Sequence, residues 1–221
     1  MATKTLRMSR ILVINPNCSQ DCSDGIAAAI APFRRLDGPE IDVATLASGP
    51  KAIYSWREWH AVVEPLCHFV ERATADIFIV ACASDPGIEA VRACTTSPVL
   101  GIFRCAVTAA VARAERFGVI ALANASKARH MSAMRSLGLE SRLAAEVAMN
   151  VSLETLLDPK AARGRLITAA KKLADAGSDT IILGCTGMSH HRAAIEAELG
   201  LPVIDPCQAA IGQALAIALT I

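Results

Sequence analysis

Short apolar runs rich in valine and isoleucine alternate with longer stretches of helical periodicity along most of the chain. Buried apolar strands that alternate with helical segments are typical of parallel sheets covered by helices on both faces. The pattern therefore predicts an α/β fold. The strands that it predicts span residues 10–14, 41–45, 77–81, 99–101, 117–121, 180–183 and 203–204.

One part of this pattern occurs twice. Asp76 opens an apolar run that ends at Cys82, and Asp179 opens a similar run that ends at Cys185. In both copies the cysteine comes six residues after the aspartate, and a Pro-Val pair opens the next apolar run. The repeat predicts two pseudo-symmetric lobes, each with a mainly parallel sheet flanked by helices, that face each other across a cleft.

The lobe boundaries follow from the repeat and from the length of 221 residues. The first lobe is expected to comprise residues 1–101 together with residues 207–221, and the second lobe residues 102–206. The C-terminal segment is assigned to the first lobe because its apolar side chains would otherwise lie exposed. We expect it to form a helix that crosses back over that lobe.

Each repeated cysteine is predicted to lie between the carboxyl end of a strand and the next helix, where ligands bind in open α/β sheets. The segment 84–86 (Ser-Asp-Pro) offers an N-cap and a proline for the first helical position, and Ser189 can cap the helix that Gly200 ends. A helix amino terminus stabilises a thiolate. We therefore expect at least one of Cys82 and Cys185 to ionise readily.

Charge and composition narrow the possible partners. Hydrophobic residues make up 53% of the chain, but no run free of charge or proline reaches the roughly 20 residues of a membrane span. The net charge of +1 and the scattered basic residues argue against nucleic-acid binding. The amino terminus does not have the pattern of a signal peptide. We expect a cytoplasmic protein that acts on a small molecule.

Eight cysteines are present, and no two have the Cys-x-x-Cys spacing. Cys18 and Cys22 have no second pair of ligands at zinc-site spacing, so we expect no metal site. In a reducing compartment most of the cysteines are expected to be small buried hydrophobes. Cys82 and Cys185 differ from the others by their symmetric positions. One thiol on each face of a ligand suits the transfer of a proton from one side of a carbon to the other.

Residues near these strand ends are candidates for substrate binding. Asn15 and Asn17 flank a proline at the end of the first strand, where their carboxamides can bind a carboxylate or imide oxygen. An ordinary turn in which Ser19 or Asp21 caps the next helix explains the same residues. The positions after the two cysteines carry small side chains that let backbone amides approach a ligand carbonyl. These positions are Ala83, Ser84, Thr186 and Gly187.

Several motifs together resemble the aspartate/glutamate/hydantoin racemase superfamily, and most of all its hydantoin and allantoin racemase branch. The motifs are Asn15-Pro16-Asn17, Ala81-Cys82 followed by Asp85-Pro86-Gly87, Pro98 to Ile102, and Leu183 to Met188. The resemblance implies flavodoxin-like lobes with the active site between them, and a cofactor-independent mechanism in which Cys82 and Cys185 are the two acid–base residues. It also implies ligand contacts at Asn15, after each cysteine, and at the end of the strand 117–121, from Ala121 and Leu122.

Some positions depart from the family pattern. Cys18 and Ala52 replace hydroxyl-bearing residues, and Ala121-Leu122 replace paired threonines, which predicts a less polar rim. Arg104 is a candidate partner of a substrate carboxylate or of a nearby acidic side chain. The leading hypothesis is a racemase, expected to form a homo-oligomer, that acts on 5-substituted hydantoins or allantoin-like rings. The alternatives are a maleate-isomerase-like or decarboxylase-like enzyme of the superfamily and a catalytically silent ligand-binding module.

Overall fold

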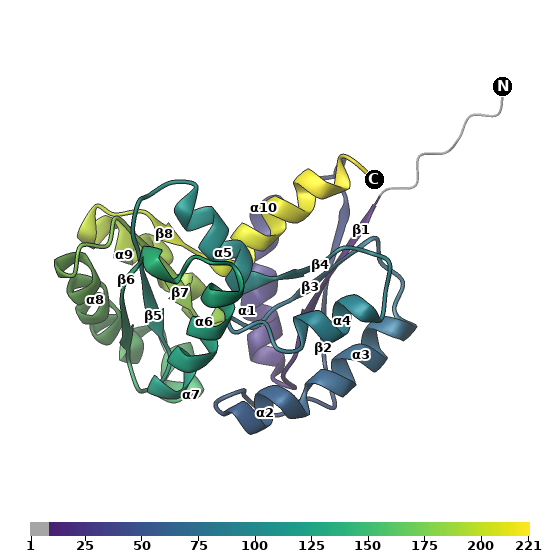
Figure 1. Ribbon diagram of the computed structural model, residues 1–221, viewed down its shortest axis with the longest axis horizontal. Coiled ribbons are helices and arrows are strands. Elements are labelled where there is room, and N and C mark those ends of the chain that lie inside the picture. Colours follow the sequence, from purple (N-terminus) through teal and green to yellow (C-terminus); the bar gives the residue numbers. More distant parts are fainter. Residues whose placement is uncertain (1–8) are drawn as a thin grey trace.

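The computed structural model describes residues 9–221 and shows two lobes joined by packed helices (Figure 1). Residues 1–8, where the sequence predicts no signal peptide, lie outside the described residues. Each lobe contains a four-stranded sheet. Every strand pairing in the described part of the chain is parallel. The predicted fold class, two α/β lobes with parallel sheets flanked by helices, is confirmed.

The first lobe has the strand order β2-β1-β3-β4. Its strands are β1 (Arg10–Asn15), β2 (Glu40–Thr45), β3 (Ile77–Val80) and β4 (Val99–Gly101). Its helices are α1 (Gln20–Ile30), the 3-10 turn η1 (Ala31–Phe33), α2 (Trp56–Ala61), α3 (Val63–Arg72) and α4 (Ile88–Ala93). The two central strands, β1 and β3, consist almost wholly of buried residues, which explains their continuous apolar sequence.

The second lobe repeats this order as β6-β5-β7-β8. Its strands are β5 (Phe117–Ala121), β6 (Leu143–Ala148), β7 (Thr180–Gly184) and β8 (Val203–Ile204). Its helical segments are α6 (Asn124–Ser136), η2 (Glu140–Arg142), α7 (Leu153–Leu157), α8 (Pro159–Asp175), η3 (Thr186–His191) and α9 (Arg192–Leu199). Because β3 and β7 hold the same place in their sheets, Cys82 and Cys185 follow equivalent strands.

The repeated aspartates have a structural role. The Asp76 carboxylate accepts a hydrogen bond of 2.7 Å from the backbone N–H of Arg10, and the Asp179 carboxylate accepts one of 2.9 Å from that of Arg116. Each aspartate N–H in turn donates to the carbonyl of the same arginine, at 2.9 Å. Both pairs of bonds fix the starts of the two central strands against each other. The repeat in the sequence therefore reflects a repeated strand register.

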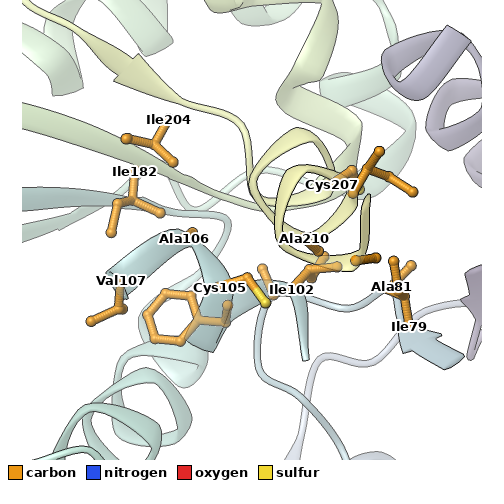
Figure 2. Close-up of a cluster of buried hydrophobic side chains, with 14 of the residues drawn as sticks. Ile79, Ala81, Ile102, Cys105, Ala106, Val107, Ile182, Ile204, Cys207 and Ala210 are labelled. Carbon is orange, nitrogen blue, oxygen red and sulfur yellow. The ribbon is translucent and has the colours of Figure 1, made fainter. Parts of the chain in front are cut away.

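The two lobes share part of their hydrophobic core. Helices α5 (Ile102–Val111) and α10 (Pro206–Ala218) pack against each other between the sheets. Figure 2 shows Ile79 and Ala81 of the first lobe on one side of these helices and Ile182 and Ile204 of the second lobe on the other. Helix α10 contacts α1 and also strands of both sheets, so the assignment of residues 207–221 to the first lobe stays a prediction. Burying each isoleucine contributes about 1.5 to 3 kcal/mol, which favours a fixed arrangement of the lobes.

The structure differs from the predicted elements at one strand. Strand β6 is absent from the prediction because all of its residues are half-buried and three of its six are alanine, which has a weak strand preference. It lies at the edge of the second sheet. Within residues 9–221, no helix combines the length and the apolar character needed to cross a membrane.

Candidate active site

Both repeated cysteines line one cavity of about 60 Å³ between the lobes. Cys82 follows β3 and Cys185 follows β7, so each thiol reaches the cavity from the carboxyl end of a central strand. A larger groove of about 680 Å³ between α5, α10 and β8 contains neither thiol. Among the described side chains, no three His, Cys, Asp or Glu residues are grouped so that they could hold a metal ion.

The predicted contact residues divide into two groups. Those that line the cavity with the cysteines are Asn17, Ala83, Ser84, Leu122 and Thr186. Three others lie outside the lining, namely Asn15, Ala121 and Gly187. Of these three, Gly187 still contacts the site, because its backbone N–H donates to the sulfur of Cys185.

Asn15 is fully buried and its carboxamide is committed to the turn after β1. Its Nδ2 donates to Asn17 Oδ1 at 3.1 Å, to the Ser19 carbonyl at 3.1 Å and to Ser23 Oγ at 3.0 Å, and its Oδ1 accepts from the Asn17 N–H. Ser19 caps α1 by accepting from the N–H of Cys22 at 3.3 Å. Asn15 therefore has the structural role of an ordinary turn residue. Asn17 stabilises the same turn and also lines the cavity.

The loop after Cys82 does not start a helix as the sequence predicts. The chain turns at Asp85 (φ 45°) and Gly87 (φ 64°), and α4 begins only at Ile88. The Asp85 carboxylate instead caps α5, because it accepts from the backbone N–H groups of Phe103 and Arg104, each at 2.9 Å. These two hydrogen bonds hold the loop that carries Cys82 against the shared core. Asp85 therefore positions the loop rather than starting its helix.

The segment after Cys185 also differs from the prediction. Ser189 does not cap α9, since its hydroxyl donates to the Thr186 carbonyl at 2.9 Å within the 3-10 turn η3. Gly200 does end α9, in the left-handed conformation (φ 69°) that favours glycine. The result is a tight turn directly after the thiol, which brings the Gly187 amide to the sulfur.

Burial dominates the ionisation of both thiols. It raises the pKa of Cys185 to about 12, against a smaller opposing effect of the Gly187 amide. Burial also raises the pKa of Cys82, but the Ser84 hydroxyl, the Ser84 amide and the Arg129 guanidinium act in the opposite direction. The expected stabilisation of both thiolates by helix amino termini is therefore wrong for the site as it is folded. Desolvation of the charged form outweighs the nearby dipoles.

Among the cavity-lining residues that the sequence analysis did not single out are two polar residues of α6, Arg129 and His130. The Arg129 side chain lines the cavity and is 3% exposed. His130 is 1% exposed, stacks on Phe103 with ring centroids 4.5 Å apart, and lies with its Nδ1 2.5 Å from a carboxylate oxygen of Glu146. With Ser126, these polar residues give the rim more hydrogen-bonding groups than the sequence predicts.

A segment of the first lobe closes one side of the cavity, and we call residues 52–59 the strap. The guanidinium of Arg129 donates to the carbonyl of Tyr54 at 3.1 Å, and the Tyr54 hydroxyl accepts from the N–H of Leu153 at 2.9 Å. At the other end, Trp59 Nε1 donates to the Ser84 carbonyl at 3.0 Å. The strap is thus bound to both lobes. Arg104, by contrast, pairs with the carboxylate of Glu89 at 2.6 Å, outside the cavity.

The fold and the two thiols define a two-lobed α/β protein with one cysteine from each lobe in a shared cavity. The chain belongs to the Asp/Glu/hydantoin racemase family, because the sequence model of that family matches residues 11–214. It is 32% identical over 207 residues to a hydantoin racemase of Paenarthrobacter aurescens, covering 91% of this chain and 87% of that protein. A hydantoin racemase of Pseudomonas sp. strain NS671 is 31% identical, covering 89% of this chain and 80% of that protein.

A solved structure agrees with these relatives. The allantoin racemase from Klebsiella pneumoniae superposes with a TM-score of 0.87 at 26% identity, covering 96% of this chain and 89% of that one. The family membership and these relatives identify the chain as an isomerase of the racemase type.

Proposed function

We propose that this chain racemises 5-substituted hydantoins or allantoin-like rings by proton transfer between Cys82 and Cys185. The relatives named above act on rings of this kind. The observation that carries the proposal is that thiols from two equivalent strands, β3 and β7, line the same small cavity. A planar carbon held between two such groups can lose a proton to one and gain a proton from the other.

The reaction needs two proton transfers and no net change of atoms. One thiolate removes the proton from the carbon next to the carbonyl, so a C–H bond breaks, an S–H bond forms and the electron pair moves into the enolate. The second thiol then gives its proton to the opposite face. General acid–base catalysis contributes roughly 10²- to 10⁴-fold, so orientation and enolate stabilisation by the polar lining must supply the rest.

The test uses pure enantiomers of 5-substituted hydantoins and of allantoin, followed by polarimetry in H₂O and by NMR in D₂O. Cys82→Ser and Cys185→Ser should each abolish racemisation, because each removes one of the two proton carriers. Cys94→Ser, which changes a half-buried thiol outside the cavity, should keep it. Full racemase activity in either cavity variant would contradict the two-cysteine mechanism.

The same samples distinguish the other hypotheses. Deuterium that enters the substrate carbon together with inversion supports the racemase. Release of carbon dioxide from a malonate-type substrate would indicate decarboxylation, and conversion of maleate would indicate a cis–trans isomerase. Binding without exchange for every compound would leave only a ligand-binding module.

A further inference from the structure

The guanidinium of Arg129 is buried without a carboxylate partner. It donates to the carbonyls of Tyr54, Ala125 and Ile53 and to the hydroxyl of Ser126, at 3.0 to 3.4 Å. Its Nε has no acceptor among the described residues. All of these acceptors are neutral, whereas buried charges in proteins are normally paired with an opposite charge. No hydrogen-bond acceptor of this guanidinium carries a negative charge, and Glu58 acts on it only through space.

The nearby carboxylates are committed to other groups. Glu58 binds the backbone N–H groups of Tyr54 and Ser55, each at 2.7 Å, and Asp85 caps α5. The titratable groups that face Cys82 and Arg129 from the packed elements are Glu58 of α2, Asp85 of the loop after β3, His130 of α6, Cys22 of α1, Cys185 after β7 and Cys207 of α10. Among these groups, Arg129 lowers the pKa of Cys82 and Asp85 raises it.

The two catalytic candidates differ in their surroundings. Cys82 has Ser84 Oγ at 3.5 Å and shares the cavity with Arg129, which favours its negative charge. Cys185 has one amide donor, from Gly187, and the thiols of Cys22 and Cys82 disfavour its ionisation further. The asymmetry is therefore electrostatic, although the strands that carry the two thiols are equivalent.

We propose that Arg129 makes Cys82 the more acidic of the two cavity thiols, so that Cys82 loses its proton before Cys185 and the singly ionised site holds a Cys82 thiolate beside a Cys185 thiol. The inference rests on the proposed function only where it identifies this thiolate with the catalytic base. In this state the guanidinium and the thiolate neutralise each other inside the closed cavity. In this form the enzyme removes a proton from one enantiomer to Cys82 and returns one from Cys185, which leaves Cys82 as the thiol and Cys185 as the thiolate. That second form acts on the other enantiomer, and proton exchange with solvent interconverts the two.

The thiols have to be titrated directly, because the equilibrium constant of a racemisation is unity and kcat/KM is the same for both enantiomers. We would measure the pH dependence of iodoacetamide labelling for each cysteine by peptide mass spectrometry, without substrate. In the unmodified chain the midpoint for Cys82 should lie at least about one pH unit below that for Cys185, as expected for a thiol that shares a buried cavity with an opposite charge.

Variants at residue 129 test the cause. Arg129→Met should raise the midpoint of Cys82 by about one to three pH units and leave that of Cys185 in place. Arg129→Lys keeps the charge and should retain most of the difference. Tyr54→Phe is the matched control, since it removes the hydroxyl that binds Leu153 and so loosens the strap without changing any charge. It should leave the difference between the two midpoints unchanged, because any change in burial acts on both thiols.

Ionisation of Cys185 before Cys82, or an unchanged Cys82 midpoint in Arg129→Met, would overturn the inference. If Arg129→Met does not fold, the order of midpoints in the unmodified chain and the behaviour of Arg129→Lys still decide the question. Because no substrate is used, a chain that shows the predicted order without racemising anything would refute the proposed function alone. A working racemase in which the two thiols titrate together would refute only this inference.

Discussion

Replacement of Asp85 by asparagine tests how the loop that carries Cys82 is anchored. The carboxylate accepts two backbone hydrogen bonds at the start of α5, at 2.9 Å each, and is 2% exposed. Burial raises its pKa to about 6, although the amides of Phe103 and Arg104 oppose the shift. Asp85→Asn keeps the size of the side chain and one acceptor oxygen, but it cannot ionise.

The magnitude follows from the shift in pKa. A change from the ordinary value of 3.8 to about 6 corresponds to about 3 kcal/mol, because one pKa unit is worth about 1.4 kcal/mol. The folded state binds this proton more tightly than the unfolded state does. The contribution of Asp85 to stability is therefore complete below about pH 4 and is lost as the pH rises to about 6. Asp85→Asn has no such loss, although one N–H left without an acceptor costs about 1 to 3 kcal/mol at every pH.

Urea unfolding of both proteins between pH 4 and 7.5 measures the effect. The free energy of unfolding of the unmodified chain, minus that of Asp85→Asn, should fall by about 3 kcal/mol across this range. Taking the difference removes the titration of all other groups. Asp24→Asn, which changes an exposed carboxylate of α1, should give a curve parallel to that of the unmodified chain. A parallel curve for Asp85→Asn would refute the assigned ionisation.

Three further substitutions test contacts around the site. Glu146→Ala leaves the buried Nδ1 of His130 without its partner, so the free energy of unfolding in urea should fall by about 1 to 3 kcal/mol. An unchanged free energy of unfolding would show that this contact does not stabilise the fold. In Gly184→Ala the new Cβ would lie 2.5 Å from the Ile120 carbonyl oxygen, so a loss of about 1 to 3 kcal/mol is expected by the same method. Gly101→Ala would place a Cβ 2.4 Å from Cγ of Asp85, and wild-type stability in this variant would contradict the close packing of the α5 cap.

The strands of the sheets were largely predictable, because central parallel strands are continuous apolar runs. Strand β6 was not predictable, since an edge strand with half-buried residues lacks such a run. Local capping signals also gave a wrong prediction where the capping side chain instead binds a group far away in the sequence. The segment 84–86 has the local pattern of a helix start, but Asp85 binds backbone groups 18 and 19 residues further along the chain. The sequence around residues 84–86 gives no indication of these long-range hydrogen bonds.

The candidate site likewise combines residues that the sequence predicts with residues whose positions depend on distant contacts. The repeat located Cys82 and Cys185, because equivalent strand ends give equivalent positions. Arg129 and His130 were missed because charged residues on a helix normally face solvent. Their signal was present as a spacing of three and four residues, since the buried positions of α6 are 126, 129, 130, 133 and 134. What buries Arg129 is the strap, which comes from the other lobe and lies some 75 residues away in the sequence.

The size of the cavity gives a last prediction about the substrate, which rests on the proposed function. A volume of about 60 Å³ is small beside the roughly 300 to 1,000 Å³ of typical small-molecule sites. A bulky ring substituent therefore has to displace the strap. That movement breaks the bonds that Tyr54 makes with Arg129 and Leu153, and each is worth about 0.5 to 1.5 kcal/mol.

Together the two bonds are worth about 1 to 3 kcal/mol, a factor of about 5 to 150, since about 1.4 kcal/mol is a factor of ten. 5-Methylhydantoin should thus exceed 5-benzylhydantoin in kcat/KM by about fivefold or more, as measured by polarimetric decay of single enantiomers. Tyr54→Ala removes the strap's largest cavity-lining side chain together with its hydroxyl, and should reduce or reverse this preference. Tyr54→Phe keeps the ring and loses only one bond, so it should retain most of it. A preference of the unmodified enzyme for the benzyl compound would contradict this reasoning. It would show that the strap opens at little cost in free energy, and that the hydrogen bonds from Arg129 to the strap carbonyls do not limit the access of substrate to the cavity.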